Sequence, residues 1–414
     1  LSAPAPTGTY TLSLHAALPI SLALTTPMSN PRFQPPRAAY IHVPFCRHRC
    51  GYCNFTVLAG RDDLTGAYLE ALERELSWLN SPREVETLFI GGGTPTHLSG
   101  ERLDQLLKIV LHWFPLTATG ELTVEANPVD MTTERAEILQ QHGVTRLSLG
   151  VQSFDDGKLQ VLERDHRRAD IEHAFQLARS VVSSVSLDLI FGVPGESIQT
   201  WQNDLESALA LRPDHLSTYG LTFERGTQFW SRLNKGQLQR ADEELEGTMY
   251  ERAIDLLTEA GFNHYEVSNF ARVDHRSVSD ADRRCRHNEV YWTGRTYYAA
   301  GPGAARFVDG RREVNHRSTT TYLKRVLAGQ SPVAESEVLD AESAARERLV
   351  FGMRRLQGVE KSRFASETGF SVETLCGNVM RQLIEQGAII EEDNCLRLTR
   401  SGLLVSDAIW PKIL

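Results

Sequence analysis

The chain has 414 residues, of which 41% are hydrophobic and 23% charged, and its formal net charge is -9. This length and composition are typical of a globular protein with one large and one smaller domain. The acidic balance argues against a general nucleic-acid surface, which needs a basic stripe. The six cysteines are too few for a disulfide scaffold. Three of them lie close together, which indicates a metal site in a reducing compartment.

The start of the chain is unusual. Residues 1–31 contain no Lys, Arg, Asp or Glu, and the first residue is Leu1. The apolar segment at residues 12–24 lacks the preceding basic segment of a secretory signal and is interrupted by Pro19. We interpret residues 1–37 as a leader that is non-native or disordered before Met28, the expected start. No stretch reaches the roughly 18 apolar residues of a membrane helix, so we expect a cytoplasmic protein.

From about residue 38 to residue 271, short apolar runs alternate with amphipathic segments. Runs of this β-branched character are typical of parallel strands buried on both faces. We predict strands at residues 39–43, 87–91, 122–126, 146–151, 185–191 and 215–221. Apolar residues at helical spacing predict helices at residues 64–79, 103–111, 134–142, 171–182, 199–211 and 243–260. Six such units predict a parallel α/β sheet, either doubly wound or curled into a full or partial barrel.

The alternation stops near residue 301, and we interpret residues 301–340 as a connecting segment. Short helices are then predicted at residues 343–356, 361–368 and 372–386, followed by a hairpin around Asp393 and Asn394. This pattern resembles a small α+β winged-helix unit over residues 341–414. Its expected recognition helix carries only one basic residue, Arg381. We therefore favour a structural or docking module over a DNA-binding one.

The strongest chemical signal is a loop that carries Cys46, Cys50 and Cys53 in C-x3-C-x2-C spacing, directly after the first predicted strand. Three thiolates can hold three irons of a 4Fe–4S cubane and leave the fourth iron open to another ligand. The alternative is a zinc site with His42 or His48 as the fourth ligand. Zinc sites of this type usually divide their cysteines between two knuckles. This chain has no second cysteine pair, so we favour the cluster.

The cysteine loop, with Tyr52 before its last cysteine, resembles the signature of the radical-SAM superfamily. The preceding Tyr40-x-His-x-Pro-Phe-Cys run resembles the coproporphyrinogen-oxidase-like branch, and the resemblance extends from Tyr40 to the C-terminal unit. It implies a partial (β/α)6 barrel over residues 38–300. It also implies a 4Fe–4S cluster whose open iron binds S-adenosylmethionine (SAM), which is then cleaved to a 5′-deoxyadenosyl radical. Tyr40 and Tyr52 are expected to contact these cofactors.

A glycine run, Gly91-Gly92-Gly93-Thr94, follows the second predicted strand. Consecutive glycines let the backbone approach a ligand closely and can direct N–H groups at it. Alone, such a run is usually a turn. Next to the cysteine loop it resembles the SAM-binding glycine motif of the superfamily, which implies contacts from Gly92, Gly93 and Thr94.

Three polar residues, Glu125, Gln152 and Asp188, are embedded near the carboxyl ends of apolar strands. A charged residue in an apolar strand is unfavourable unless it is paired or bound to a ligand, and barrels bind ligands at this edge. The alternative is a hydrogen-bond network that only positions loops. The resemblance implies that Glu125 contacts the SAM beside the cluster. It also implies that Gln152, Asp188 and Arg164 match positions that hold a second SAM, although Arg164 also suits a solvated helix end.

The branch contains oxygen-independent coproporphyrinogen III oxidases and HemW-type heme chaperones. The oxidases carry an additional cysteine two residues after the third, where this chain has Phe55, and a longer segment before the loop. His287-Asn288-Glu-Val-Tyr291-Trp292 resembles the chaperones' HNxxYW motif and follows their typical run at residues 265–270. The resemblance therefore implies a heme chaperone and assigns no catalytic residue. An oxidase of porphyrin biosynthesis is the alternative.

An exposed histidine flanked by aromatic residues is a reasonable heme clamp, because imidazole ligates heme iron. We therefore take His287 as the candidate heme ligand, with a core or loop-supporting role as the alternative. Cys285 is either a thiolate ligand or a bystander. The polar residues 274–284 resemble an insertion beside the motif. The expected partners are heme, a heme-acceptor protein and a flavodoxin- or ferredoxin-like electron donor.

Overall fold

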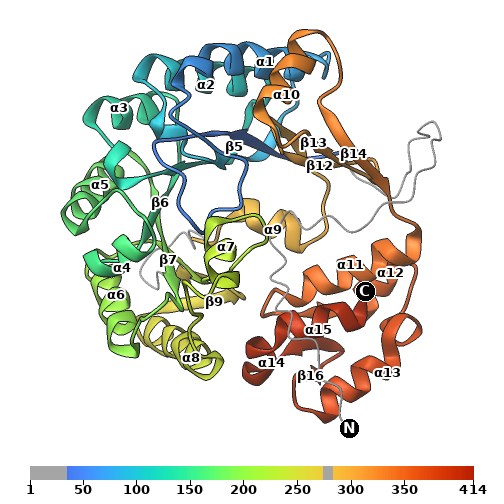
Figure 1. Cartoon of the computed structure of the whole chain (residues 1–414). Helices are drawn as coiled ribbons and strands as arrows, with labels where there is room; N and C mark the ends of the chain where they lie inside the picture. Colours follow the sequence, from blue (N-terminus) through green and yellow to red (C-terminus); the bar gives the residue numbers. More distant parts are fainter. Residues whose placement is uncertain (1–34, 274–282) are drawn as a thin grey trace. The chain divides into compact units, whose positions relative to one another are not determined.

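The computed structural model describes residues 35–273 and 283–414 (Figure 1). These residues form two units, each of which makes most of its contacts internally. The barrel unit contains the described chain up to Val290 together with Arg295–Ser336, and the C-terminal unit contains Glu337–Leu414 with Tyr291–Gly294. The predicted leader up to residue 34 and most of the predicted insertion at residues 274–284 lie outside the described residues.

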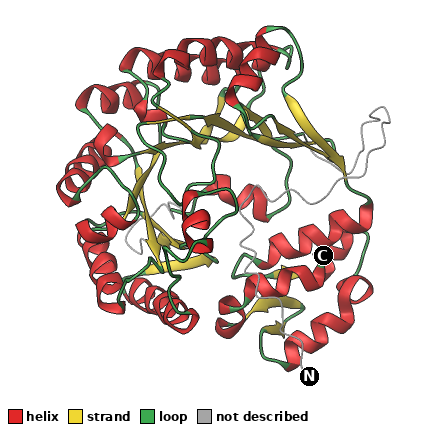
Figure 2. Ribbon diagram, viewed as in Figure 1, coloured by secondary structure: helices red, strands yellow, loops and turns green. Residues whose placement is uncertain are grey.

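The main sheet has the strand order β11-β1-β4-β5-β6-β7-β8-β10-β9. Its six central strands are parallel and correspond to the six predicted ones: β1 Ala38–Val43, β4 Val85–Gly92, β5 Leu116–Ala126, β6 Arg146–Gln152, β7 Ser184–Phe191 and β8 His215–Gly220. Their spatial order follows the chain order, whereas a doubly wound sheet reverses direction part-way. The sheet is curved with the helices on its outer side (Figure 2). The predicted partial α/β barrel is therefore confirmed.

Helices on the outer side connect successive parallel strands (Figure 1). They are α1 Thr65–Ser77, α2 Gly100–Trp113, α3 Thr133–Gln141, α5 Arg168–Val181, preceded by the shorter α4 Asp156–Val161, and α6 Ile198–Ala210. Helix α8 Glu243–Glu259 leads from β8 to the edge of the sheet, and the short α7 Gln228–Asn234 lies on the inner side of the curve (Figure 1). The side chains of Ser99, Thr132 and Ser197 accept hydrogen bonds from backbone N–H groups at the starts of α2, α3 and α6. These N-caps satisfy donors that have no partner within the helix.

The two faces of the sheet differ in chemistry. Leu147 and Leu149 of β6 and Leu187 of β7 are fully buried, on the face that packs against the helices. Because side chains alternate along a strand, Ser148 and Asp188 lie on the other, inner face and hydrogen-bond to each other. Hydrophobic burial between sheet and helices therefore stabilises the barrel while the inner face carries polar groups.

The edges of the sheet carry further structure. β11 (Tyr298–Ala300) pairs with β1, while β10 (Asn269–Arg272) and β9 (Phe262–Glu266) extend the edge beside β8. The segment 301–340 is structured rather than a simple connection. It forms a three-stranded sheet and one helix: β12 Ala305–Val308, β13 Arg311–Asn315, β14 Val333–Val338 and α10 Thr319–Leu327, which packs against α1. These strands are short and polar, so they lack the apolar run by which a strand is recognised.

One buried carboxylate joins this segment to α1. Glu75 accepts hydrogen bonds from Gly301 N (2.9 Å), Asn315 Nδ2 (2.7 Å) and Tyr322 OH (2.6 Å). Burial raises the pKa of Glu75, and these hydrogen bonds act in the opposite direction. A single side chain of α1 thus holds the end of β11, β13 and α10 together.

The C-terminal unit contains helices α11 Ala341–Met353, α12 Lys361–Thr368, α13 Val372–Glu385, α14 Arg400–Leu404 and α15 Ser406–Ile413, and a small sheet of β15 Val359–Glu360, β17 Cys395–Leu398 and β16 Ile389–Glu392. At the hairpin turn, Asp393 and Asn394 have positive φ angles of 48° and 65°, as a type I′ turn requires. Trp292, from the end of α9 (Arg286–Trp292), packs here, with the Arg354 guanidinium 4.5 Å from its ring centroid.

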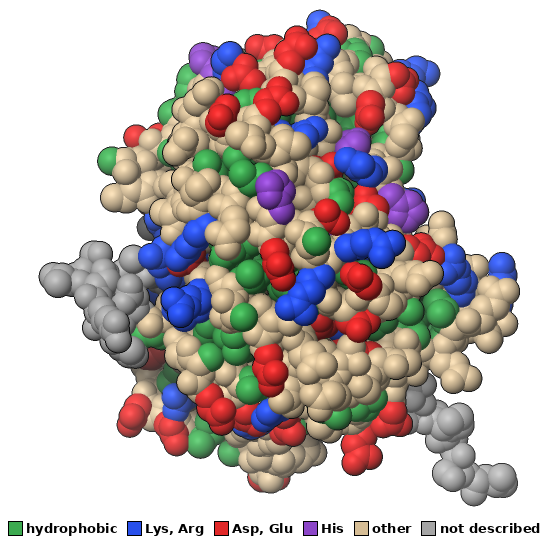
Figure 3. Space-filling view, turned by 90° about the vertical axis from the view of Figure 1, so that its left-hand side faces the viewer, with side chains coloured by type: hydrophobic (Ala, Val, Ile, Leu, Met, Phe, Trp, Pro, Cys, Tyr) green, Lys and Arg blue, Asp and Glu red, His purple; other side chains and the backbone are tan. Residues whose placement is uncertain are grey.

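The outer helical surface is mixed in charge. On the face drawn in Figure 3, acidic and basic side chains are interspersed and do not gather by sign. In the two described stretches of the chain, no helix combines the length and the apolar character needed to cross a membrane.

We predict that Glu75→Ala lowers the free energy of unfolding by about 3 kcal/mol, because it leaves buried donors without an acceptor. Denaturant unfolding of the full chain measures this change. Glu73→Ala, at an exposed position of the same helix, is the matched control and should change stability by less than about 0.5 kcal/mol. Equal effects of the two substitutions would contradict the proposed role of Glu75.

Candidate cofactor-binding site

The three cysteines lie on the loop that follows β1, at the carboxyl edge of the barrel strands. Cys46 ends β2 (Phe45–Cys46), which pairs with β3 (Leu58–Ala59) and closes the loop. Within the loop, Cys53 N donates to Cys50 O (3.1 Å). None of the three thiols is in a disulfide. One loop therefore presents three thiols, the donor set that a cubane with one open iron requires.

The zinc alternative finds no fourth ligand in His42. This residue is 1% exposed, its Nδ1 lies 3.0 Å from Tyr40 OH, and its Nε2 lies 2.8 Å from Thr56 O. His48 is exposed on the loop. Within residues 35–273 and 283–414, no group of three or more His, Cys, Asp or Glu side chains is arranged to hold a metal ion, and this includes the three loop cysteines. By residue type, three thiols on one loop, with His42 engaged elsewhere, suit a cluster with one open iron better than a zinc ion.

The surroundings of the thiols are poor in solvent. Burial raises the pKa of Cys46 to about 12, although the Thr94 hydroxyl, 3.4 Å from Cys46 Sγ, acts in the opposite direction. Burial also raises the pKa of Cys53. Without a metal these thiols stay protonated at neutral pH, and bound iron would supply the positive charge that stabilises thiolates. The Arg164 guanidinium, 3.5 Å from Cys50 Sγ, adds a permanent positive charge.

The glycine run packs directly against the cysteine loop. A Cβ atom on Gly93 would lie 2.5 Å from Val43 O, and one on Gly92, whose φ is 96°, would lie 2.2 Å from His42 Nδ1. Gly93 N donates to Val43 O (2.8 Å), and Thr94 N donates to Phe45 O (2.7 Å). These N–H groups therefore bind protein acceptors, contrary to the expectation that they face a ligand. The glycines are needed for close approach of two backbones.

Glu125 lies next to this run, near the end of β5. Its Oε2 accepts a hydrogen bond from Gly92 N (2.8 Å), and a Cβ atom on Gly91 would lie 2.5 Å from its carboxyl carbon. Burial, and then the nearby Asp188 carboxylate, raise the pKa of Glu125 to about 8, while the Gly92 N–H opposes the shift. The ligand-free carboxyl group is therefore largely protonated at neutral pH. A cationic ligand would favour its ionised form.

Gln152 and Arg164 meet at the end of β6. Gln152 has a φ of 64°, at a register shift between β6 and β7. Arg164 Nη2 donates to Asn127 Oδ1 (2.7 Å) and to Gly150 O (3.0 Å). Its Nε is buried and has no hydrogen-bond partner among the described residues. Arg164 therefore faces the barrel interior, and the solvated helix end considered as its alternative is wrong.

Asp188 lies farther down the barrel, in β7. The Ser148 hydroxyl donates to both of its carboxylate oxygens (3.1 and 3.0 Å). Burial raises the pKa of Asp188, while Ser217, Ser148 and Arg146 act in the opposite direction. Part of the hydrogen-bonding capacity of Asp188 is thus used within the sheet. This agrees with the alternative prediction, a hydrogen-bond network that positions loops.

The inner face of the barrel has an open layer and a filled layer. Nearer the carboxyl ends of the strands, six side chains remain partly or largely exposed: Tyr40, Phe89, Glu125, Ser148, Asp188 and Tyr219. Nearer the amino ends, five polar side chains are buried: Thr87, Thr123, Arg146, Ser186 and His215. A ligand that enters from the carboxyl ends of the strands can therefore reach the open layer but not the filled layer.

Sequence reasoning missed three members of the open layer: Phe89, Ser148 and Tyr219. It also missed Asn127, which holds Arg164. Each of the three lies inside a run that reads as apolar core. A signal was present, because alternate residues share a face. Phe89 lies two residues before Gly91, and Ser148 two before Gly150.

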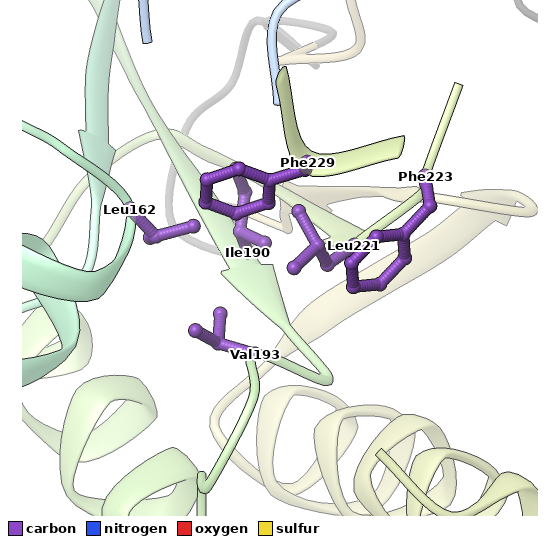
Figure 4. Close-up of a cluster of buried hydrophobic side chains, with 6 residues drawn as sticks. All are labelled: Leu162, Ile190, Val193, Leu221, Phe223 and Phe229. Carbon is purple, nitrogen blue, oxygen red and sulfur yellow. The ribbon is translucent and has the colours of Figure 1, made fainter. Parts of the chain in front are cut away.

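A hydrophobic cluster supports the cysteine loop from one side (Figure 4). It consists of Leu162, Ile190, Val193, Leu221, Phe223 and Phe229, with Tyr52 packed against it. Phe229 of α7 donates its backbone N–H to Gly51 O (2.9 Å), and its ring centroid is 6.1 Å from that of Tyr52. A Cβ atom on Gly51 would lie 2.5 Å from the Phe229 ring. Helix α7, which was not predicted, therefore fixes the position of the loop.

His287 lies away from the cysteine loop, among the buried residues near the amino ends of the strands. It is 1% exposed, its Nδ1 lies 3.0 Å from Thr87 Oγ1, and its ring centroid is 5.3 Å from that of Phe89. Burial lowers the pKa of His287 to about 3, so its imidazole is neutral. The expectation of an exposed histidine is wrong, because Thr87 and Phe89 of β4 cover the ring.

The chain before His287 is held in the same layer. Glu121 accepts hydrogen bonds from the backbone N–H groups of Arg286 (3.3 Å) and His287 (3.1 Å). Cys285 N donates to Tyr265 OH (3.2 Å). Cys285 is 3% exposed, and burial raises the pKa of its thiol to about 12, so the bystander interpretation fits better than that of a thiolate ligand.

Comparisons with known proteins agree with this architecture. The model of the radical SAM superfamily matches residues 40–208, and that of the HemN C-terminal domain matches residues 339–405. The chain is 34% identical over 380 residues to the heme chaperone HemW of Bacillus subtilis, covering 90% of this chain and 98% of the relative. The chain belongs to the HemW family of radical-SAM proteins.

Two further relatives and one solved structure are also similar to the chain. A HemW of Lactococcus lactis is 32% identical over 382 residues, covering 92% of this chain and 98% of the relative. The mitochondrial radical S-adenosyl methionine domain-containing protein 1 of Danio rerio is 34% identical over 395 residues, covering 91% and 86%. The structure of coproporphyrinogen III oxidase (HemN) from Escherichia coli matches with a TM-score of 0.79 at 20% identity, covering 92% of this chain and 91% of that one. The HemW family therefore shares its fold with HemN.

We predict that Gly93→Ala lowers the iron content of the anaerobically reconstituted protein to about half or less, because an added side chain overpacks this contact. The added Cβ meets the backbone oxygens of Val43 and Phe45, at 2.5 and 2.7 Å, so the cysteine loop must shift. Iron and sulfide per chain measure the effect. Gly377→Ala is the control, because its Cβ would meet only Glu373 Cβ, at 3.6 Å. Full iron loading of Gly93→Ala would contradict the proposed close approach.

Proposed function

We propose that the chain is a heme chaperone that binds heme, a 4Fe–4S cluster and SAM, and transfers heme to an acceptor protein. The observation that carries this proposal is the similarity, over nine-tenths of the chain, to relatives named heme chaperone HemW. Phe55, which is 45% exposed, adds support because it occupies the position of the oxidases' additional cysteine. Formation of protoporphyrinogen by a coproporphyrinogen III oxidase activity is the alternative.

The proposed cofactor ligands follow from the site. Cys46, Cys50 and Cys53 would hold the cluster, which supplies an electron for reductive chemistry on bound SAM. The SAM-contacting group would consist of residues around the loop and on the inner face: Tyr40, Tyr52, Gly92, Gly93, Thr94, Glu125, Gln152, Arg164 and Asp188. The two carboxylates of this group favour the cationic amino and sulfonium groups of SAM. Arg164 offsets the negative charge of the thiolates.

We propose His287 as the heme ligand, and its burial means that the ring must first become accessible. A neutral imidazole is the form that ligates iron. Heme can reach it only if the ring leaves its contacts with Thr87 and Phe89. Heme binding at this residue therefore requires a local opening of the amino end of the barrel.

The test uses the anaerobically reconstituted full chain. We expect heme titration to give a shifted Soret band, and the bound heme to pass to an added apo-heme protein. Incubation with coproporphyrinogen, SAM and a reductant should yield no protoporphyrinogen, since the additional cysteine is absent. His287→Ala should alter the heme spectrum, whereas His173→Ala, at an exposed position of α5, should not. Formation of protoporphyrinogen would refute the chaperone proposal, and an unchanged His287→Ala spectrum would refute the ligand.

We also propose a cytoplasmic location and an acidic flavodoxin- or ferredoxin-like electron donor. The cysteine loop exposes two arginines between two of the proposed cluster cysteines in an otherwise acidic chain. Arg47 forms ion pairs with Asp130 (3.0 Å) and Asp165 (3.6 Å), so Arg49 supplies the positive charge that a partner would meet. Complementary charge accelerates association of protein partners.

Charge reversal tests this docking. We expect Arg49→Glu to slow reduction of the cluster by flavodoxin about tenfold at low salt, since steering depends on charge. Reduction by dithionite should be unchanged. Arg363→Glu, at an exposed position of the C-terminal unit, serves as the control. Equal rates for the two variants with flavodoxin would rule out the loop as the docking surface.

A further prediction concerns pH. Because the pKa of Glu125 is raised to about 8, its proton must leave before the carboxylate can bind the cationic amino group of SAM. The apparent SAM affinity should therefore rise with pH below about 8, by up to about tenfold per pH unit, and fall again above it, because the α-amino group of SAM loses its own proton near the same pH. Equilibrium dialysis from pH 6 to pH 9 measures this. Glu125→Gln should remove the rise, and Glu172→Gln, at an exposed position of α5, should keep it.

A further inference from the structure

Tyr219 is exposed near the end of β8, whereas the residues before it in the strand are buried. In β8, His215, Ser217 and Thr218 are at most 3% exposed, whereas Tyr219 is 42% exposed. Alternation along the strand puts Tyr219 on the same inner face as His215 and Ser217. Tyr219 is therefore an accessible aromatic side chain on the inner face of the barrel, near the carboxyl end of its strand, where barrels bind ligands.

The neighbours of Tyr219 are the polar groups of the open layer. In the sheet register Asp188 lies opposite Ser217, and Ile190 lies opposite Tyr219. Ser217 is therefore the cross-strand neighbour of Asp188, and it lies on the same face as Tyr219, two residues before it. Ser148 completes this row through its own bond to Asp188. Tyr219 therefore stands beside Asp188, one residue pair nearer the carboxyl edge where ligands enter.

The side chains around Tyr219 and Asp188 favour one of two kinds of ligand. An aromatic ring next to a carboxylate suits a planar group that also carries hydroxyl donors, because carboxylates accept hydrogen bonds from ribose hydroxyls and rings stack on bases. A tetrapyrrole also has a flat face, but its propionates would lie close to Glu125 and Asp188. The positively charged Arg164 is already bound to Asn127, Gly150 and Cys50. Charge therefore favours an adenosyl group with a cationic sulfonium.

We propose that Tyr219 is a further ligand-contacting residue, whose ring stacks on the adenine of a SAM molecule held by Asp188. This inference rests on the proposed binding of SAM and is independent of heme transfer. The phenol stays protonated at physiological pH, because burial and the Asp188 carboxylate both raise its pKa. It can therefore donate a hydrogen bond while its ring stacks.

The experiment measures SAM binding to the anaerobically reconstituted full chain by equilibrium dialysis. We expect Tyr219→Leu to weaken SAM binding about tenfold or more, because it removes the stacking surface. Tyr219→Phe keeps the ring and should stay within about threefold of the unaltered protein by the same argument. Tyr298→Leu is the control, since this ring packs against Phe114, with centroids 5.5 Å apart.

Iron content and heme titration are recorded for every variant. SAM binding unchanged in Tyr219→Leu, with normal iron content, would overturn the inference and leave the chaperone proposal standing. Weakened heme binding with unchanged SAM binding would also overturn it, in favour of a tetrapyrrole contact. If Tyr219→Leu fails to retain iron, fluorine NMR of the protein labelled with 3-fluorotyrosine decides. SAM should shift the resonance assigned through Tyr219→Phe, and an unshifted resonance would refute the contact.

Discussion

The site depends on the close approach of two backbone segments, the glycine run after β4 and the cysteine loop after β1. Two hydrogen bonds, from Gly93 N to Val43 O and from Thr94 N to Phe45 O, join them at 2.8 and 2.7 Å. A side chain on Gly93 would prevent both. The same approach brings the Thr94 hydroxyl to Cys46 and the Gly92 N–H to the Glu125 carboxylate. The candidate cluster ligands and the polar groups beside them are thus positioned together.

Stability and ligand binding depend on opposite faces of the barrel sheet. Its outer face gains free energy from apolar burial under the helices, so the inner face can carry Glu125, Asp188 and Arg164. Each is held by specific partners, such as Asn127 for Arg164 and Ser148 for Asp188. Buried polar groups need such partners, and those that have them are rigidly placed. The inner face is therefore preorganised before any ligand arrives.

The six parallel strands could be predicted because a strand buried on both faces is a continuous apolar run. The three loop cysteines could be singled out as candidate cluster ligands because their spacing is local. The polar strands over residues 305–338 could not be predicted, since they take their stability from contacts such as Glu75 with Asn315, 240 residues apart. The prediction that His287 is exposed was wrong for the same reason, because Thr87, which covers its ring, lies 200 residues away in the sequence. The structure gives the positions of the residues proposed to contact SAM, and the contacts themselves are predictions.

The carboxylate of Glu121 has a consequence for how the protein assembles. It accepts hydrogen bonds from the backbone N–H groups of Arg286 and His287, which lie 165 and 166 residues away in the sequence. During synthesis the parallel strands leave the ribosome before this segment, so these two hydrogen bonds can form only after most of the barrel has been made. Contacts between such distant parts of a chain form slowly, because closing a long loop costs conformational entropy.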